Sequence, residues 1–547
     1  MKFNRLGVFI ALGLGAMSLT ATGQLYLEGP SRQAHSHSQA HPQSVQMPRQ
    51  EAPLNRVVIK FRESSSTRGT EQASTRAAAE QRVQALGTDV AMRTPQGRAI
   101  GLNYLKTTGN EAQVALTSEP MDRATMNALV QRLSQDSHVE YAEIDERAYP
   151  QMTPNDTRYA ADQWSMRAPS VSALGAANFS TAWDRTASGT ALKGTGVIVA
   201  VLDGGYRLHA DLAGNILSGY DFVSADSVGV YTTANDGDGR DSDAQDPGNW
   251  NTVASTGCPV ADSSWHGTHV AGTIAALGNN NQGVIGGAYG AKILPVRVMG
   301  VCGGYATDIA DGIRWAAGLS VAGAPSNSNP ARIINMSLGG TGSCGTTYQS
   351  AITAARNAGA VIVAATGNDS SYTTLNAPAN CNGVIAVTAH MTNGTSPTYA
   401  NIGLGTTISA PGENITSTTN TGTTVPVADS YAAKGGTSMA VPHVAATIAL
   451  VMQAVPGITP DQVSTALTSS ARAFPTGTYC VGKYNTVNSC GAGLLDADAA
   501  VNAALNPSRN AGGGGGGGAW DWLDLASLLV LALAAVLLQR RGAQALH

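Results

Sequence analysis

The run Val197-Ile-Val-Ala-Val-Leu-Asp-Gly-Gly205 is an apolar segment that ends in a carboxylate followed by two glycines. Two other glycine-rich segments follow it in the chain, His266-Gly-Thr-His-Val-Ala-Gly272 and Gly436-Thr-Ser-Met-Ala-Val-Pro-His443. Each segment presents one reactive side chain beside glycines, and these are Asp203, His266 and Ser438. Serine becomes a useful nucleophile when an imidazole accepts its proton and a carboxylate orients that imidazole. The three segments therefore indicate nucleophilic catalysis.

Apolar runs of the same kind recur between about Gly196 and Ala504, and Ala-rich helical stretches separate them. We expect strands at 197–202, 291–296, 333–336 and 361–365. Near-continuous apolar strands that alternate with helices are typical of a parallel sheet covered on both faces, which is an α/β fold. A late helix has a clear start signal, with Thr459 as its cap, Pro460 at its first position and Gln462 completing a capping box.

A smaller unit precedes this region, at 54–150. Its pattern predicts strands at 56–62, 101–105, 113–116 and 138–144 and helices at 74–86 and 122–135. This β-α-β-β-α-β order is typical of a small ferredoxin-like α+β unit.

Both ends of the chain have the composition of targeting segments. Residues 1–23 have the charged start, apolar middle and small-residue end of a secretion signal, although a membrane anchor is the alternative. Residues 24–53 are polar and Pro-rich, which predicts a disordered linker. A Gly-rich linker at 506–519 precedes a C-terminal segment at 520–547 with an apolar core and two arginines, which we interpret as a membrane or sorting segment. A buried core helix is the alternative for this segment.

Composition narrows the class of protein. The chain has 547 residues, 43% of them hydrophobic and 13% charged, so two or three folded units are expected. A net charge of −4 and the lack of a basic stripe argue against a nucleic-acid partner. The six cysteines suggest three disulfides in an exported protein, and we favour the pairs Cys258–Cys302, Cys344–Cys381 and Cys480–Cys490 among the fifteen possible pairings.

The three catalytic segments, together with Asn335-Met-Ser-Leu-Gly-Gly340 and Val363-Ala-Ala-Thr-Gly-Asn368, resemble the subtilisin-family serine peptidases (subtilases). Five motifs in the right order make this resemblance specific, and it covers about 163–504. It implies a parallel-sheet α/β peptidase domain at 163–504 and an inhibitory propeptide at 54–150, with self-cleavage between about Glu146 and Ala161. The C-terminal tail resembles the Gly-rich sorting signals of some Gram-negative secreted proteins.

The resemblance assigns a role to each motif residue. Ser438 is the nucleophile, His266 the general base and acid, and Asp203 the residue that orients His266. The side chain of Asn368 and the backbone N–H of Ser438 form the oxyanion site. The segment Ser337, Leu338 and Gly339 pairs with an extended substrate, although an ordinary core strand is the alternative reading. His269 and His443 are expected to be packing residues.

The chain departs from the family pattern at three positions. Gly204 follows Asp203 where the family has Ser or Thr, so a hydroxyl that can bond the carboxylate is missing. Thr366 stands where Ala is usual, and Val441 where Thr is usual. No departure removes a catalytic group.

The acidic loop 235–246 is a candidate calcium site, with a solvated surface loop as the alternative. Its carboxylates repel one another unless a hard cation lies between them, and they belong to Asp236, Asp238, Asp241, Asp243 and Asp246. The catalytic chemistry itself needs no cofactor.

The leading hypothesis is an exported serine endopeptidase made as a self-processing zymogen, with polypeptides as substrates and its own propeptide as inhibitor. We expect it outside the cell or on the surface of a Gram-negative-type bacterium, with transient or permanent membrane contact through its tail. A surface-anchored binding protein with a degenerate peptidase domain is the alternative. A lipase-type hydrolase is disfavoured because the chain has no Gly-x-Ser-x-Gly elbow.

Overall fold

The computed structural model describes residues 54–62, 76–90, 93, 98–145, 152–187, 189–255, 258–481 and 489–507. The expected secretion signal (1–23), linker (24–53) and C-terminal segment (520–547) lie outside these residues, as does most of the Gly-rich linker. Two main sheets occur in the described part, one of four strands and one of seven.

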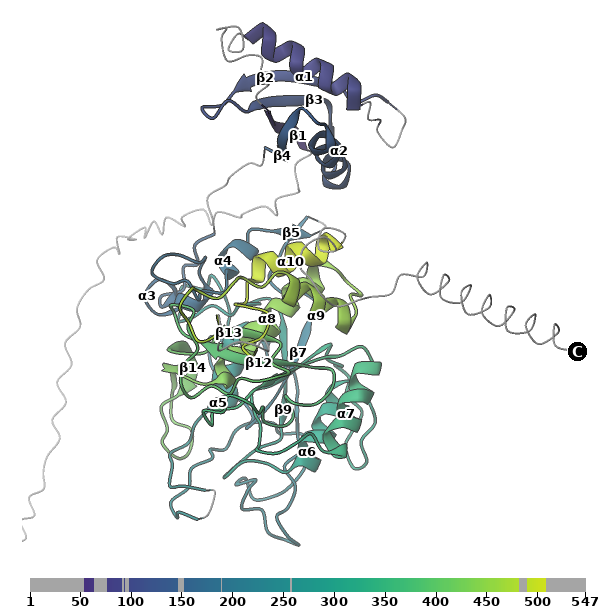
Figure 1. Ribbon diagram of the computed structural model, residues 1–547. Coiled ribbons are helices and arrows are strands. Elements are labelled where there is room, and N and C mark those ends of the chain that lie inside the picture. Colours follow the sequence, from purple (N-terminus) through teal and green to yellow (C-terminus); the bar gives the residue numbers. More distant parts are fainter. Residues whose placement is uncertain are drawn as a thin grey trace, which may run out of the picture. The chain divides into compact units, whose positions relative to one another are not determined.

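The four-stranded sheet belongs to the N-terminal region and has the strand order β2-β3-β1-β4 (Figure 1). It confirms the expected β-α-β-β-α-β alternation. Asp122 caps α2, because its side chain accepts a hydrogen bond from the backbone N–H of Thr125. The elements are β1 (Leu54–Phe61), α1 (Arg76–Val90), β2 (Leu102–Thr107), β3 (Gln113–Met121), α2 (Arg123–Gln135) and β4 (Val139–Ile144).

Helix α1 runs four residues past its expected end at Leu86. A glycine, Gly87, follows that position. In the structure Gly87 lies inside the helix against β2, where an added Cβ would meet the Leu102 Cβ at 3.2 Å. Gly87 is therefore a point of close packing, and tertiary contact overrides its low helix propensity.

The seven-stranded sheet is entirely parallel and has the order β13-β12-β11-β10-β7-β9-β8. The expected strands all occur in it, within one residue of the expected bounds. Its strands are β7 (Ile198–Asp203), β8 (Tyr220–Asp221), β9 (Lys292–Arg297), β10 (Ile333–Met336), β11 (Val361–Ala365), β12 (Val384–His390) and β13 (Ile408–Pro411).

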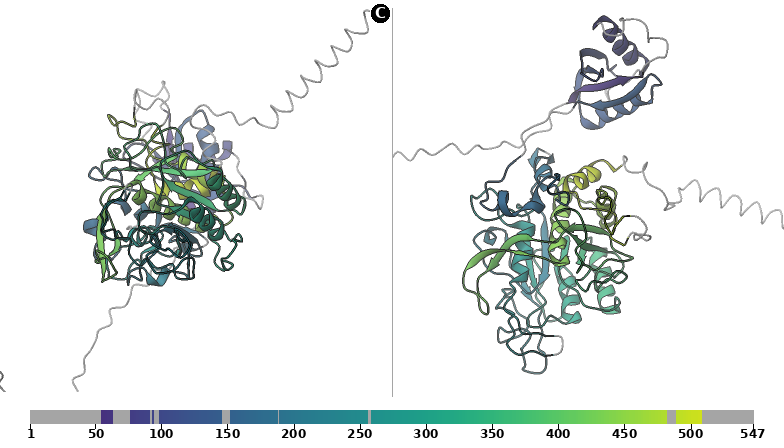
Figure 2. Two further views of the ribbon diagram at one scale, coloured as in Figure 1. Left: turned by 90° about the horizontal axis from the view of Figure 1, so that it is seen from below. Right: turned by 60° about the vertical axis from the view of Figure 1, so that its left-hand side comes forward.

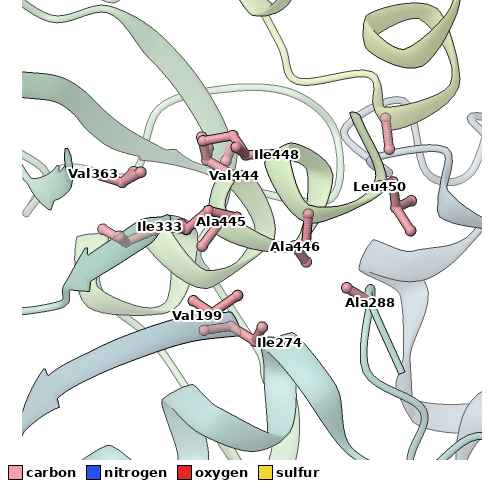
Figure 3. Close-up of a cluster of buried hydrophobic side chains, with 14 of the residues drawn as sticks. Val199, Ile274, Ala288, Ile333, Val363, Val444, Ala445, Ala446, Ile448 and Leu450 are labelled. Atoms are coloured by element: carbon pink, nitrogen blue, oxygen red, sulfur yellow. The ribbon is translucent and has the colours of Figure 1, made fainter. Parts of the chain in front are cut away.

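Helices cover both faces of this sheet, as the apolar strands predicted (Figures 1 and 2). One face packs on α5 (His266–Ala275) and α8 (Thr437–Ala454), and the other on α6 (Ala306–Ala316) and α7 (Thr346–Asn357). Figure 3 shows the first of these cores, in which Val199, Ile333 and Val363 of the sheet meet side chains of α8. The core therefore packs α8 against β10, β11 and β12 of the sheet.

Smaller elements complete this region. The expected capping box at Thr459 is present at the start of α9. A two-stranded antiparallel ribbon, β14–β15, packs on α5. These elements are α3 (Tyr159–Asp162), α4 (Phe179–Ala182), β5 (Thr186–Ala187), β6 (Thr190–Ala191), β14 (Ile415–Asn420), β15 (Asp429–Lys434), α9 (Pro460–Ser469) and α10 (Ala497–Leu505), with short 3₁₀ turns at Trp164–Met166 and Ala213–Asn215.

The six cysteines form the three expected pairs, Cys258–Cys302, Cys344–Cys381 and Cys480–Cys490. They close loops of 44, 37 and 10 residues, and each crosslink stabilises the fold chiefly by restricting the unfolded chain.

Among the described residues, one helix is long and apolar enough to cross a membrane, and it is α8. Its most apolar window is 83% buried inside the protein. Helix α8 is therefore a core helix, and its apolar character reflects burial against the sheet.

Candidate active site

Asp203 is the last residue of β7 and is fully buried. The backbone N–H of Gly204 donates a hydrogen bond of 2.8 Å to its Oδ1 atom. The backbone thus supplies a donor to the carboxylate, although the hydroxyl usual in the family is absent. An added Cβ at Gly204 would lie 3.8 Å or more from its neighbours, so glycine is not required there by space.

His266 is the first residue of α5, and the preceding Trp265 adopts a left-handed backbone with φ of 48°. Its Nδ1 atom lies 2.9 Å from each carboxylate oxygen of Asp203. Since a carboxylate accepts, Nδ1 carries the proton and Nε2 keeps a free lone pair. An added Cβ at Gly267 would lie 2.1 Å from the Gly205 carbonyl oxygen, so only glycine permits this approach.

Ser438 is the second residue of α8 and follows Gly436, whose φ of 149° is accessible to glycine. Its position places the hydroxyl near the positive end of the helix dipole. The Ser438 Oγ atom donates a hydrogen bond of 2.9 Å to the carbonyl oxygen of Ser337. No hydrogen bond joins Ser438 to His266 in the described part of the chain. Such bonds often form only once substrate is bound.

Asn368 lies beside the start of α8 in the loop after β11. Its Oδ1 atom accepts hydrogen bonds from the backbone N–H of Thr437 at 2.9 Å and the Thr437 hydroxyl at 3.0 Å. Because the amide NH₂ group cannot accept a hydrogen bond from the Thr437 N–H, this contact identifies the other end of the Asn368 amide as Nδ2. A Cβ added at Gly436 would lie 3.5 Å from this Nδ2 atom and 3.7 Å from the Ser438 nitrogen. The two expected oxyanion donors therefore border one small space.

The expected substrate-binding segment follows β10. The ladder of β10 with its neighbours ends at Met336, and the next bridge pairs Gly340 with Ala377. Ser337, Leu338 and Gly339 thus leave the sheet ladder next to Ser438, and Gly339 is exposed. The segment begins beside the expected nucleophile, at Ser337, and has a small residue at each end.

The two other motif histidines are fully buried. The Nε2 atom of His269 lies 3.0 Å from the Ala432 carbonyl oxygen, and burial lowers the pKa of His269 to about 3. The ring of His443 contacts the Met439 carbonyl oxygen and the Ser165 hydroxyl, and burial lowers its pKa to about 4. Both rings are neutral at ordinary pH, which agrees with packing roles.

The acidic loop does not gather its carboxylates around one point, so the predicted calcium site is not supported there. No group of three or more His, Cys, Asp or Glu side chains suited to a metal occurs among the described residues. Asp236 pairs with the guanidinium of Arg297. Asp241 and Asp243 each accept a hydrogen bond from a backbone N–H two residues further on. Arginine and backbone N–H groups thus satisfy charges that we expected a cation to neutralise.

Asp246, the last residue of that loop, lies behind the candidate site. Its Oδ2 atom would be 3.9 Å from a Cβ at Gly204, and only 2% of the residue is exposed. Burial raises the pKa of Asp246 to about 6, against a hydrogen bond from the Gly248 N–H that lowers it. Lys434 lies close by: its ammonium donates to the Ser264 carbonyl, and burial lowers its pKa while the charges of Asp203 and Asp246 raise it. Sequence reasoning missed the approach of Asp246 and Lys434 to the site, because none of the five family motifs contains either residue and Asp246 was assigned to the acidic loop.

Comparison with known proteins agrees with this geometry. A model of the subtilase family matches residues 194–505. An extracellular protease of Xanthomonas campestris is 47% identical over 419 residues, which cover 76% of this chain and 68% of that protein. An extracellular basic protease of Dichelobacter nodosus is 38% identical over 473 residues, covering 83% and 72% respectively.

A solved structure gives the same result. A protease of Pseudoalteromonas arctica superposes with a TM-score of 0.58 and is 49% identical, covering 64% of this chain and all of its own. The family match spans more than half of the chain, and it includes the three segments that carry Asp203, His266 and Ser438. This chain belongs to the subtilase family of serine endopeptidases.

Proposed function

We propose that Ser438, His266 and Asp203 form the catalytic triad of an exported endopeptidase. The observation that carries the proposal is the contact of His266 Nδ1 with both carboxylate oxygens of buried Asp203, 2.9 Å from each. This contact directs the basic Nε2 atom away from Asp203 and stabilises the imidazolium that forms during catalysis. The start of α8 supplies the nucleophile beside Asn368.

The reaction proceeds in two halves. The Ser438 hydroxyl turns from the Ser337 carbonyl, gives its proton to His266 Nε2, and its oxygen bonds to the scissile carbonyl carbon. The resulting oxyanion accepts hydrogen bonds from Asn368 Nδ2 and the Ser438 N–H. His266 then protonates the leaving amine, the C–N bond breaks and an acyl-enzyme remains. Water then gives a proton to His266 Nε2 as its oxygen bonds to the acyl carbon. The bond between that carbon and Ser438 Oγ breaks, His266 returns the proton to Oγ, and the carboxylic acid leaves.

The proposed substrates are extended or unfolded polypeptides. Residues 337–339 leave the sheet beside Ser438, so an incoming strand pairs there with backbone groups. Small residues at both ends of this segment favour close approach of two backbones. Because pairing needs a free backbone edge, we expect compact proteins to be poorer substrates than unfolded ones.

We propose that the ferredoxin-like unit at 54–145 is an inhibitory propeptide. The backbone N–H of Met152 donates to Asp184, and that of Asn279 donates to Asp156. These contacts support a cut before Met152, within the interval from about Glu146 to Ala161 expected from sequence. The proposed domains are otherwise those expected: signal 1–23, linker 24–53, propeptide, peptidase, Gly-rich linker 506–519 and sorting tail 520–547.

The test is the intact mass of the exported product, made with and without Ser438→Ala. We expect the parent chain to lose its first ~150 residues and hydrolyse casein, and the variant to keep them and remain inactive. Identical processing of both chains, with no casein hydrolysis by either, would replace the triad proposal with the alternative of an inactive binding protein. If both chains are processed identically and only the parent hydrolyses casein, another peptidase removes the propeptide.

A further inference from the structure

The side chain of Asn401 is buried beneath the loop that presents Asn368, and only 1% of the residue is exposed. Its Oδ1 atom accepts hydrogen bonds from the backbone N–H groups of Asp369 and Ser371, both at 2.9 Å. Its Nδ2 atom donates to the Thr366 carbonyl at 3.2 Å and to Asp369 Oδ2 at 2.9 Å. One amide thus bonds to residues on both sides of Asn368.

The backbone of Asn401 holds the same loop. Its N–H donates to the Gly367 carbonyl at 2.9 Å, and its carbonyl accepts the Thr366 hydroxyl at 2.7 Å. Gly367 has a φ of 108°, and an added Cβ there would lie 2.4 Å from Asn401 Nδ2. Thr366 is one of the three positions where the sequence departs from the family pattern. Its hydroxyl, which the usual alanine lacks, donates the hydrogen bond to the Asn401 carbonyl.

We infer that Asn401, with Thr366, is a positioning residue for the oxyanion donor Asn368, and this inference rests on the proposed function of that donor. Thr437 fixes the Asn368 side chain through Oδ1, and Asn401 fixes the backbone that carries it. Neither contact alone determines where Nδ2 lies. An oxyanion donor stabilises the transition state only when it is held in place beforehand.

The test is a double-mutant cycle of Asn401→Asp and Asn368→Ala in the full-length chain. Asn401→Asp keeps an oxygen for the Asp369 and Ser371 N–H groups but places a second oxygen against the Thr366 carbonyl and Asp369 carboxylate. We expect kcat for a peptide anilide to fall about tenfold or more with little change in KM, since small misplacements at a reacting centre have large effects. Active-site titration corrects each kcat for the folded fraction.

The cycle separates this inference from the proposed function. If Asn401 acts through Asn368, the Asn401→Asp change has little further effect once Asn368 is alanine. Equal losses of kcat in both backgrounds would overturn the positioning role. If instead Asn368→Ala leaves kcat unchanged, the assignment of Asn368 to the oxyanion site is the part that fails.

Two threonines give a milder, matched comparison in case Asn401→Asp does not fold. Thr366 and Thr388 are both fully buried, and both donate to the Asn401 carbonyl, at 2.7 and 2.9 Å. Thr366 leads into the Asn368 loop, whereas Thr388 lies in β12. We expect Thr366→Val to lower kcat roughly threefold or more and to weaken a peptide aldehyde inhibitor, and Thr388→Val to change neither beyond about twofold. Equal effects from the two variants would refute the inference.

Discussion

The hydroxyl of Ser337 donates a hydrogen bond of 2.8 Å to the backbone carbonyl of Ser438. In a regular helix this carbonyl would accept from the N–H four residues later, but that residue is Pro442, which has none. The Ser337 hydroxyl therefore supplies the hydrogen-bond donor that Pro442 lacks, at the residue that carries the proposed nucleophile. In return, the Ser438 hydroxyl donates to the Ser337 carbonyl.

Ser337→Ala should destabilise the protein by about 1–2 kcal/mol, because it leaves a half-buried carbonyl without a donor. The measurement is urea unfolding in a Ser438→Ala background, which prevents self-digestion. Pro442→Ala restores a helical N–H. When Pro442→Ala is added to the Ser438→Ala chain, the loss of stability caused by Ser337→Ala should therefore be smaller. An equal cost in both backgrounds would show that the Pro442 gap is not what Ser337 fills.

Gly204→Ser should fold and keep kcat within a few-fold of the parent. The new Cβ has room, with its nearest neighbours at 3.8 and 3.9 Å, and the Gly204 N–H still bonds Asp203. The comparison is Gly205→Ala, whose Cβ would lie 2.7 Å from the Ala244 carbonyl oxygen at a φ of 97°. Activity and thermal midpoint should fall for Gly205→Ala alone. A similar loss at Gly204 would mean that its glycine is required.

Gly267→Ala should lower kcat by about a hundredfold, since its Cβ would push α5 away from the Gly205 carbonyl and misplace His266. Gly272→Ala, in the same helix, is the control because its Cβ would meet Thr418 and Ser417, on the β14 side of α5. Both variants should lose thermal stability, whereas kcat per titrated site should collapse only for Gly267→Ala. Equal kcat in the two would argue against tight coupling of His266 to Asp203.

Asp246 should make stability depend on pH in an identifiable window. Its pKa is about 6 in the folded protein and 3.8 as the ordinary value, so between these pH values the folded state binds more protons. Its contribution is fully present below about pH 4 and is lost as pH rises through 6, by up to about 3 kcal/mol.

The measurement is urea unfolding of Ser438→Ala with and without Asp246→Asn, from pH 4 to 8. The difference in unfolding free energy between the two proteins isolates Asp246, because all other titrating groups are shared. As pH rises, we expect the chain with Asp246 to lose about 3 kcal/mol of unfolding free energy relative to the Asp246→Asn chain. A difference that stays flat would mean that Asp246 titrates at its ordinary value.

Much of this protein follows from local sequence. The position of Asp203 at the end of a strand could be predicted, because a buried parallel strand is a continuous apolar run and the polar residue after it marks the carboxyl edge of the sheet. The capping box at Thr459 and the alternation of the small N-terminal sheet are equally local signals. Each depends on residues a few positions apart, where backbone geometry fixes the relation between side chains.

How distant segments meet depends on tertiary packing. The acidic loop looked like a cation site, yet Arg297, far along the chain, neutralises Asp236, and Asp246 turns inward behind Gly204. Likewise nothing near Asn401 marks it as the support of a loop that begins 35 residues earlier at Thr366. Local patterns in the sequence predict which chemical groups end each strand and begin each helix. Which groups face one another depended on packing, because side-chain direction and long-range contact are set only when the whole core closes.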